Sequence, residues 1–480
     1  MRFARPLSVP CACLLLSAFF LFSFPSLAQG VSKPSDRENR KELRGALRQA
    51  RDAVVRLAAE DDSTVDSSIS DKVNQLVQSL LFVGDRDDVR YLQSHLKDVY
   101  ANEIHNVLEA SSTPQDFASR ISKADRMKDV FEHDKELQTI VSQEIERGFL
   151  DEAAGTAQKI LLPGSRSRAF VDIAIAQHGK GNDSAADEAV TAAIQACFQP
   201  GTDLPLIIDP PDRQLTQLAS GLAYRGYLQG AQRAFAEAEK AVGANPKADT
   251  FDWSNLAGAA ISIDDLPSAV RWMQKVETDD QRADLQTQIA LAQARQEGPD
   301  SVVQTALKIK DPWVKITALR DTANKQSDAG DSGGAIATLR IAIEATNGTN
   351  ERPVLLLHDL AWAQIDAGDR IAAEQTLERA LKENEKPAFG QDQVDGWSLL
   401  ADTFAFLGHF DRAHQIALKI DDHYFRGRAL GFIAQREVEA GRSKEALAWA
   451  KQLEDPNERA STYLAIAGTT IEKLKDESNR

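Results

Sequence analysis

The sequence predicts an all-α solenoid built from antiparallel helical hairpins. The first observation is a recurring triplet: a small residue, a glycine seven positions later and an alanine five positions after that, repeating at about 34 residues. The second is a set of apolar residues at constant distances from the same glycine. A repeat of this length is one helical pair that buries its apolar face against its neighbours. The triplets are Ala174, Gly181, Ala186; Ala219, Gly226, Ala231; Ala323, Gly330, Ala335; Ala361, Gly368, Ala373; Ala401, Gly408, Ala413; and Ala434, Gly441, Ala446.

The glycine of each triplet, which we call the anchor, is expected to form the turn between helix A and helix B of one hairpin. A tight turn at a helix end needs a residue that tolerates a positive φ, and glycine does so without steric cost. The small residues before and after the anchor are expected where the two helices cross. A large side chain there would push the helices apart.

Apolar residues stand eight positions before the anchor and nine positions after it. At these distances they extend the apolar stripes of the two helices, so we expect them in the core. The residues before the anchors are Ile140, Ile173, Leu218, Leu256, Leu360, Leu400 and Ile433, and those after are Val190, Phe235, Met273, Leu307, Leu339 and Leu377.

This pattern resembles the tetratricopeptide repeat. The small residue before the anchor, the alanine after it and the later apolar residue fall where that family has them, and Trp253 and Trp397 stand at the family's tryptophan position. The chain departs from the family where Asp264 replaces an anchor glycine and Val303 replaces an alanine. The resemblance implies a right-handed superhelix with helix A lining a concave groove. Its anchors are Gly148, Gly181, Gly226, Asp264, Gly298, Gly330, Gly368, Gly408 and Gly441, with weaker candidates at Gly84 and Ser112.

The residue twelve positions after the anchor divides the repeats into two kinds. Alanine occurs where the next anchor is distant, which predicts a longer helix B or loop. A bulky aliphatic residue occurs where the next anchor follows closely or where the last repeat ends, which predicts a compact turn. The alanines are Ala193, Ala238, Ala342 and Ala380, and the aliphatic residues are Ile160, Val276, Ile420 and Leu453.

The N-terminus has the arrangement of a secretory signal peptide over residues 1–28. Arg2 and Arg5 precede an apolar run, and Ser26, Leu27 and Ala28 form a small-residue cleavage site. The run is shorter than the roughly 20 residues that span a bilayer. We therefore expect export to the periplasm or the extracellular space, with no integral membrane segment after cleavage.

The remaining chain is predicted to fall into four parts. Residues 29–66 read as an amphipathic helix, Ser35 to Glu60, with a polar linker, and this helix either caps the first hairpin or tethers the array. Residues 67–135 are degenerate helical repeats, and residues 136–459 are the repeats that resemble the tetratricopeptide repeat (TPR-like repeats). Residues 460–480 form a closing helix and a charged tail, as a soluble repeat array requires.

The composition excludes some partners. The chain has 72 acidic and 56 basic residues and a net charge of −16, which argues against nucleic acid as a partner. After signal cleavage Cys197 is the remaining cysteine, so no internal disulfide is expected, and burial of this thiol is the simplest expectation.

No constellation of residues predicts catalysis, a cofactor or a metal. Gly330, Asp331, Ser332, Gly333 and Gly334 spell the nucleophile segment of trypsin-like proteases, but they occupy the turn of a helical hairpin. The histidines do not follow a metal-binding spacing. The repeats leave no stretch long enough for a separate catalytic domain, so we expect a protein that is not an enzyme.

The candidate binding site is the predicted inner face of helix A. Positions ten, six and three before the anchor lie on one stripe, and there they collect amides, arginines and a tryptophan that suit an extended peptide. The candidate groove residues are Gln288, Arg295, Arg320, Asn324, His358, Trp362, Ser398, Asp402 and Gln435.

The leading hypothesis is a non-enzymatic scaffold of the bacterial cell envelope or secreted space that binds a protein or peptide along this groove. One alternative is an α/α-toroid enzyme that acts on polysaccharide, although sugar clefts are rich in aromatic residues and this chain is 6% aromatic. Another is a structural subunit of an envelope complex, held by the N-terminal helix.

Overall fold

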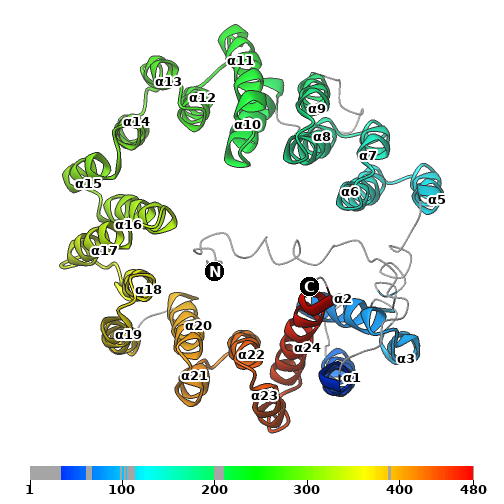
Figure 1. Ribbon diagram of the computed structural model, residues 1–480. Helices are drawn as coiled ribbons and strands as arrows, with labels where there is room; N and C mark the ends of the chain where they lie inside the picture. Colours follow the sequence, from blue (N-terminus) through cyan, green and yellow to red (C-terminus); the bar gives the residue numbers. More distant parts are fainter. Residues whose placement is uncertain are drawn as a thin grey trace. The chain divides into compact units, whose positions relative to one another are not determined.

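The described part of the chain is all-α. The computed structural model describes residues 34–60, 67–97, 100–101, 104, 114–198, 210–386 and 391–478, and these contain 23 helices (Figure 1). The fold class predicted from the repeats is confirmed, because the helices pair as consecutive antiparallel hairpins. The predicted signal peptide lies outside the described residues. Among the described helices, none has the length and apolarity to cross a membrane.

The helices belong to two compact units, which are described separately. Unit 1 takes residues 112–296 and unit 2 takes residues 30–111 and 297–480. The helices of unit 1 are α5 Pro114–Ala124, α6 Val130–Glu146, α7 Leu150–Ala157, α8 Pro163–Gly179, α9 Asp183–Cys197, α10 Pro211–Tyr224, α11 Leu228–Ala244, α12 Thr250–Ser262, α13 Leu266–Met273 and α14 Asp279–Glu297, which ends at the unit boundary.

Unit 2 combines helices from both ends of the chain. Its helices are α1 Pro34–Glu60, α2 Ser67–Phe82, α3 Arg86–His95, α15 Pro299–Lys308, α16 Pro312–Asp328, α17 Ser332–Ala345, α18 Val354–Asp366, α19 Arg370–Asn384, α20 Gln391–Phe406, α21 Phe410–Ala417, α22 His423–Glu439, α23 Ser443–Ala450 and α24 Pro456–Ser478.

The anchors form left-handed turns that end helix A. All the anchor glycines from Gly148 to Gly441 have a φ between 77° and 118°, and so does the weaker candidate Gly84 at 75°. At Gly368, the following residue Asp369 donates its backbone N–H to the carbonyl oxygen of Gln364 at 2.8 Å, which is the long bond of a Schellman motif. Seven other anchors repeat this bond. Ser112 lies outside the described residues.

Asp264 adopts the same turn without being glycine. Its φ of 60° is the only positive value among the described non-glycine residues. Aspartate tolerates this region better than most residues, but its Cβ still costs about 1 kcal/mol there. The turn geometry is therefore imposed by the hairpin and not by the residue that occupies it.

The predicted core positions are buried with two departures. Ile140, Leu256 and Leu400 are fully buried, whereas Met273 is half-buried. The prediction is wrong for Leu307, which is 46% exposed. Helix α15 begins one residue after its anchor, where other B helices begin two residues after, so its buried face rotates onto Val302, Val303 and Ala306.

The two predicted kinds of repeat differ in the length of helix B. Where alanine stands twelve after the anchor, helix B has 14 to 17 residues, as in α9, α11, α17 and α19. Where the residue is a bulky aliphatic, helix B has 8 residues, as in α7, α13, α21 and α23. The predicted division is confirmed.

An arginine that the sequence analysis did not single out stabilises three of the compact turns. Six residues after the buried aliphatic, its guanidinium donates to the carbonyl oxygen of that aliphatic residue. The bonds are Arg166 to Ile160 at 2.6 Å, Arg282 to Val276 at 3.0 Å and Arg426 to Ile420 at 2.6 Å. The carbonyl groups that the short helix leaves unpaired are thereby satisfied.

A buried hydrogen bond ties helix A to helix B in two hairpins. Thr338 donates to the side chain of Gln326, and Thr376 donates to the side chain of Gln364, each at 2.8 Å. These residues stand four before and eight after their anchors. In unit 1 the same positions hold Glu144 and Thr156, so a carboxyl group replaces the amide.

Burial raises the pKa of Glu144 from 4.5 to about 7, although the hydrogen bond from Thr156 acts in the opposite direction. The side chain is 1% exposed. A raised pKa often marks a catalytic acid. At this position the equivalent glutamines show that the residue belongs to the architecture of the hairpin.

The two ends of the chain share one core. Helix α1 packs along α24, and the two lie side by side in Figure 1. Leu43, Leu47 and Val54 of α1 are buried in one cluster with Tyr463 and Leu464 of α24. The N-terminal helix therefore packs mainly on the last helix and less on its sequence neighbours.

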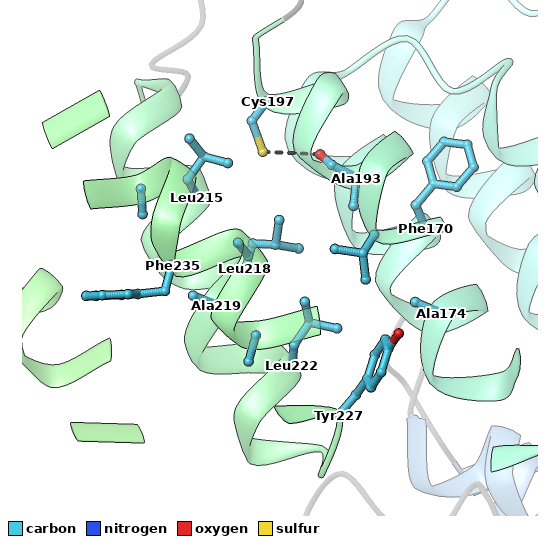
Figure 2. Packing of buried hydrophobic residues seen from close by; sticks show 14 of the residues in the cluster. Phe170, Ala174, Ala193, Cys197, Leu215, Leu218, Ala219, Leu222, Tyr227 and Phe235 are labelled. Carbon is cyan, nitrogen blue, oxygen red and sulfur yellow. Dashed lines mark hydrogen bonds between the residues drawn. The ribbon is translucent and has the colours of Figure 1, made fainter. Parts of the chain in front are cut away.

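Unit 1 has its own core, part of which is shown in Figure 2. Leu215, Leu218 and Leu222 of α10 pack together with residues of the preceding hairpin. Cys197 is buried beside the carbonyl oxygen of Ala193 at 3.4 Å. Burial raises the pKa of this thiol, which disfavours the reactive thiolate. The expected burial of Cys197 is confirmed.

We expect Glu144→Gln to stabilise unit 1 in a pH-dependent way. Because the folded pKa lies above the unfolded value, the native state binds the extra proton, and stability falls as the pH rises from 4.5 to about 7. The variant should gain about 3 kcal/mol at pH 8 and little at pH 4. Thermal unfolding of both proteins across this range measures the difference, and Gln326→Glu is the converse control. A pH-independent difference would contradict the assignment.

Candidate functional site

The predicted groove residues lie on consecutive A helices, but they are divided between the units. Gln288 and Arg295 are exposed on α14 of unit 1, and the groove prediction remains untested for them. The other residues belong to unit 2: Arg320 and Asn324 on α16, His358 and Trp362 on α18, Ser398 and Asp402 on α20, and Gln435 on α22.

The first group of interactions joins α16 to α18. The guanidinium of Arg320 donates to Asp359 at 2.5 Å, and both side chains are largely buried. His358 Nδ1 lies 3.1 Å from the other oxygen of Asp359, and the indole N–H of Trp362 donates to His358 Nε2 at 3.0 Å. Arg320, Asp359, His358 and Trp362 thus form a continuous chain of hydrogen bonds.

The tryptophan determines the tautomer of His358. An indole N–H is only a donor, so Nε2 must accept and the ring proton lies on Nδ1, where it donates to Asp359. Burial alone would raise the pKa of Asp359, but the His358 hydrogen bond and the Arg320 charge lower it below its ordinary value. The pair of Arg320 and Asp359 therefore orients His358, and His358 in turn orients Trp362.

The second group joins α20 to α22. Arg436 donates to both oxygens of Asp402, at 2.9 and 3.2 Å, and also to Glu439 at 3.1 Å. Gln435 donates to the other oxygen of Glu439 at 3.0 Å. Burial would lower the pKa of Arg436, but the hydrogen bonds and charges of the two acids raise it.

Two aromatic rings connect these groups. The centroids of Trp362 and Phe406 are 4.7 Å apart, and the guanidinium of Arg436 lies 5.4 Å from the centroid of Phe406. Both rings are half-buried. We call the surface formed by Arg320, Trp362, Asp402, Phe406 and Arg436 the helix A face of unit 2.

The structure brings together five of the seven predicted residues of unit 2. Ser398 instead donates to the carbonyl oxygen of Val394 on its own helix at 3.0 Å. Asn324 is half-buried and makes no side-chain hydrogen bond to a described residue. Because Arg320 and Asp402 are held in ion pairs with neighbouring helices, the aromatic rings and peripheral amides are the groups left for a ligand.

The sequence analysis missed Asp359, Phe406, Arg436 and Glu439, although the register contains a signal for them. Arg320 stands ten before its anchor and Asp359 nine before the next one, and Asp402 and Arg436 stand six and five before theirs. A residue of one helix A thus pairs with a residue of the next helix A that stands one position closer to its own anchor. Searching for opposite charges with this offset would have found both pairs.

A separate cluster has the spacing of a metal site. One ligand atom each of His423, Asp455 and Glu458 lies within 4.8 Å of the others. His423 Nδ1 contacts Oε1 of Glu458. The guanidinium of Arg426, however, donates to this same oxygen at 2.7 Å and lies 2.8 Å from His423 Nδ1. A cation is already present, so this cluster is better described as a polar link between α22 and α24.

The protease-like pentapeptide is a helix cap in the structure. Gly330 forms the anchor turn, Asp331 caps α17 by accepting from the backbone of Gly334 at 2.9 Å, and Ser332 begins the helix. Its serine is therefore part of an ordinary hairpin turn.

No protein-family model matches the chain, and no curated protein matches it either. Solved structures with a similar arrangement include a protein from Thermococcus onnurineus NA1, with 16% identity, a TM-score of 0.29, and coverage of 79% of this chain and 98% of that one. Another is a signal transduction ATPase with a tetratricopeptide repeat sensor from Pyrococcus horikoshii, with 13% identity, a TM-score of 0.30, and coverage of 94% and 67%. At these scores the likenesses carry no inference about function.

We expect the charges of Arg320 and Asp359 to be energetically coupled. In a cycle of Arg320→Met, Asp359→Asn and the double variant, the coupling in unfolding free energy should be about 1 to 3 kcal/mol, because both groups are largely buried. Urea unfolding of the four proteins measures it. The same cycle on the exposed pair Arg412 and Glu378, 3.4 Å apart, should give a coupling near zero. Additive effects at Arg320 and Asp359 would refute the network.

Proposed function

We propose that this protein is an exported, non-enzymatic scaffold of the bacterial cell envelope or secreted space, and that it binds a protein or peptide on the helix A face of unit 2. The observation that carries the proposal is the aromatic pair Trp362 and Phe406, set between two arginine–carboxylate pairs on consecutive A helices. Tryptophan and arginine are the residues that most often dominate binding energy at interfaces.

The geometry supports binding because the rings are held in place before a partner arrives. Trp362 is hydrogen-bonded to His358, and Phe406 packs between Trp362 and Arg436. Side chains that are already ordered lose less conformational entropy on association. Asn324 and Gln435 add amide groups at the margin, suited to the backbone of an extended segment.

The electrostatics support the non-enzymatic part of the proposal. A general acid needs a carboxyl group that retains its proton near the working pH. At the helix A face the pKa of Asp359 is lowered, and the second carboxylate, Asp402, receives two hydrogen bonds from Arg436. Both acids are thus arranged as fixed charges that orient their neighbours.

The export part of the proposal rests on Arg2, Arg5, the apolar run and the Ser26–Ala28 cleavage site. We expect the protein isolated from a bacterial host to begin at Gln29 and to appear in the periplasmic or secreted fraction. N-terminal sequencing and fractionation test this. A protein that retains Met1 in the cytoplasmic fraction would contradict it.

We expect Trp362→Ala/Phe406→Ala to lose the partner. In affinity purification from envelope extract, proteins recovered with the wild type should fall about tenfold or more with this variant, because truncated interface anchors cost 2 kcal/mol or more. The matched control is Trp313→Ala, which removes a 62% exposed tryptophan at the start of α16. Equal recovery with all three proteins would exclude the helix A face.

The double variant also removes packing, so its fold needs a separate control. Circular dichroism and the thermal midpoint establish whether unit 2 remains intact. Asn324→Arg adds bulk at the margin without removing an aromatic contact and should reduce recovery as well. If Asn324→Arg and the folded double variant both bind normally, the proposed face is wrong.

A further inference from the structure

A polar pocket lies between helices α17, α18 and α19 of unit 2, and the residues of the helix A face are not part of its lining. Its volume is about 450 Å³. Arg340 and Ile343 of α17, Leu360 and Gln364 of α18, and Thr376 and Arg379 of α19 line it. A volume of this size suits a small ligand or one side chain of a partner.

The floor of the pocket carries the side-chain amide of Gln364. Gln364 is 5% exposed, and its side-chain oxygen accepts the hydroxyl of Thr376 at 2.8 Å. The hydrogen bonds among the described residues do not use its amide nitrogen, which is not one of the fully buried polar atoms that lack a partner. This nitrogen can therefore exchange solvent for an acceptor that enters the pocket.

Two arginines at the pocket form no ion pair within the part of the chain that the structure describes. Arg340 and Arg379 are exposed, and no described carboxylate lies within 4 Å of either guanidinium. Glu344 follows Arg340 by one helical turn and also lines the pocket, yet the two form no such pair. The lining thus carries two arginines and one glutamate, a net positive charge in a protein whose overall net charge is −16, and this favours an anion.

The neighbouring hairpin shows that the arginines are not part of the repeat. It has the same floor, Gln326 bonded to Thr338. The positions equivalent to Arg340 and Arg379, counted from their anchors, hold Lys308 and Ile341. The buried amide and threonine are therefore architecture, whereas the arginine pair is specific to this pocket.

We propose that the pocket binds a carboxylate group. The guanidinium groups of Arg340 and Arg379 and the amide of Gln364 hold its oxygens, while Ile343 and Leu360 cover the adjacent carbon atoms. Arginine presents paired donors that match the geometry of a carboxylate. Glu344 repels a doubly charged phosphate more strongly than a singly charged carboxylate. The carboxylate belongs either to a small organic acid or to an acidic side chain of another protein.

Isothermal titration calorimetry at low ionic strength tests the pocket. The probes are butyrate, a blocked peptide with one glutamate, and inorganic phosphate. We expect butyrate or the peptide to bind, with about tenfold weaker affinity for Arg340→Gln/Arg379→Gln, which removes two charge-assisted contacts. Arg168→Gln, which changes an exposed arginine of α8 that does not line the pocket, is the control. Binding of butyrate identifies a small acid, and binding of the peptide alone identifies an acidic side chain.

The proposal is overturned if neither carboxylate binds, if phosphate binds more tightly than both, or if the double variant binds as the wild type does. Both arginines are exposed, so circular dichroism should be unchanged in the variants. Arg340→Lys/Arg379→Lys keeps the charge but loses the paired donors, and it should also bind more weakly. Trp362→Ala/Phe406→Ala should leave carboxylate binding intact, so failure of this site is distinguishable from failure of the proposed scaffold.

Discussion

The structure depends on one backbone interaction, repeated at the end of most A helices. The residue after the anchor donates its N–H to the carbonyl oxygen four residues before the anchor, which requires the anchor to have a positive φ. This bond ends helix A at a defined residue, and helix B then starts two residues after the anchor. The distances of the core residues from the anchor follow from it, and so do the buried bonds of Gln326 and Gln364 to their threonines.

The same register determines which side chains meet between hairpins. Stacking places one helix A beside the next with an offset of one position, so Arg320 reaches Asp359 and Asp402 reaches Arg436. The chain can therefore build a row of polar and aromatic groups by choosing residues at only a few positions of each repeat. The aromatic contact between Trp362 and Phe406 continues this row between the two ion pairs.

Sequence reasoning was strong where the repeats agree and weak where one repeat differs. The anchors, most buried apolar positions and the two lengths of helix B were predictable, because several hairpins carry the same evidence. The exposure of Leu307 was not, since α15 begins one residue early. For the site, the stripe carrying Arg320 and Trp362 was predictable, but its partner residues were not, because the offset between adjacent A helices is a property of stacking. The packing of α1 on α24 joins residues from opposite ends of the chain, and no local pattern encodes it.

The most direct test of this account exchanges residues at two anchors. Asp264→Gly should raise the thermal midpoint of unit 1, because it removes the Cβ from a backbone with φ of 60°. Gly368→Asp should lower the midpoint of unit 2, and each exchange should change the free energy of unfolding by about 1 kcal/mol. An added Cβ at Gly368 meets no atom within 4 Å, so a steric clash of this Cβ does not contribute to the change in stability. Opposite changes of similar size are the predicted result. If neither exchange alters stability, or if Asp264→Gly destabilises the protein, the left-handed anchor turn is not the constraint on which the fold depends.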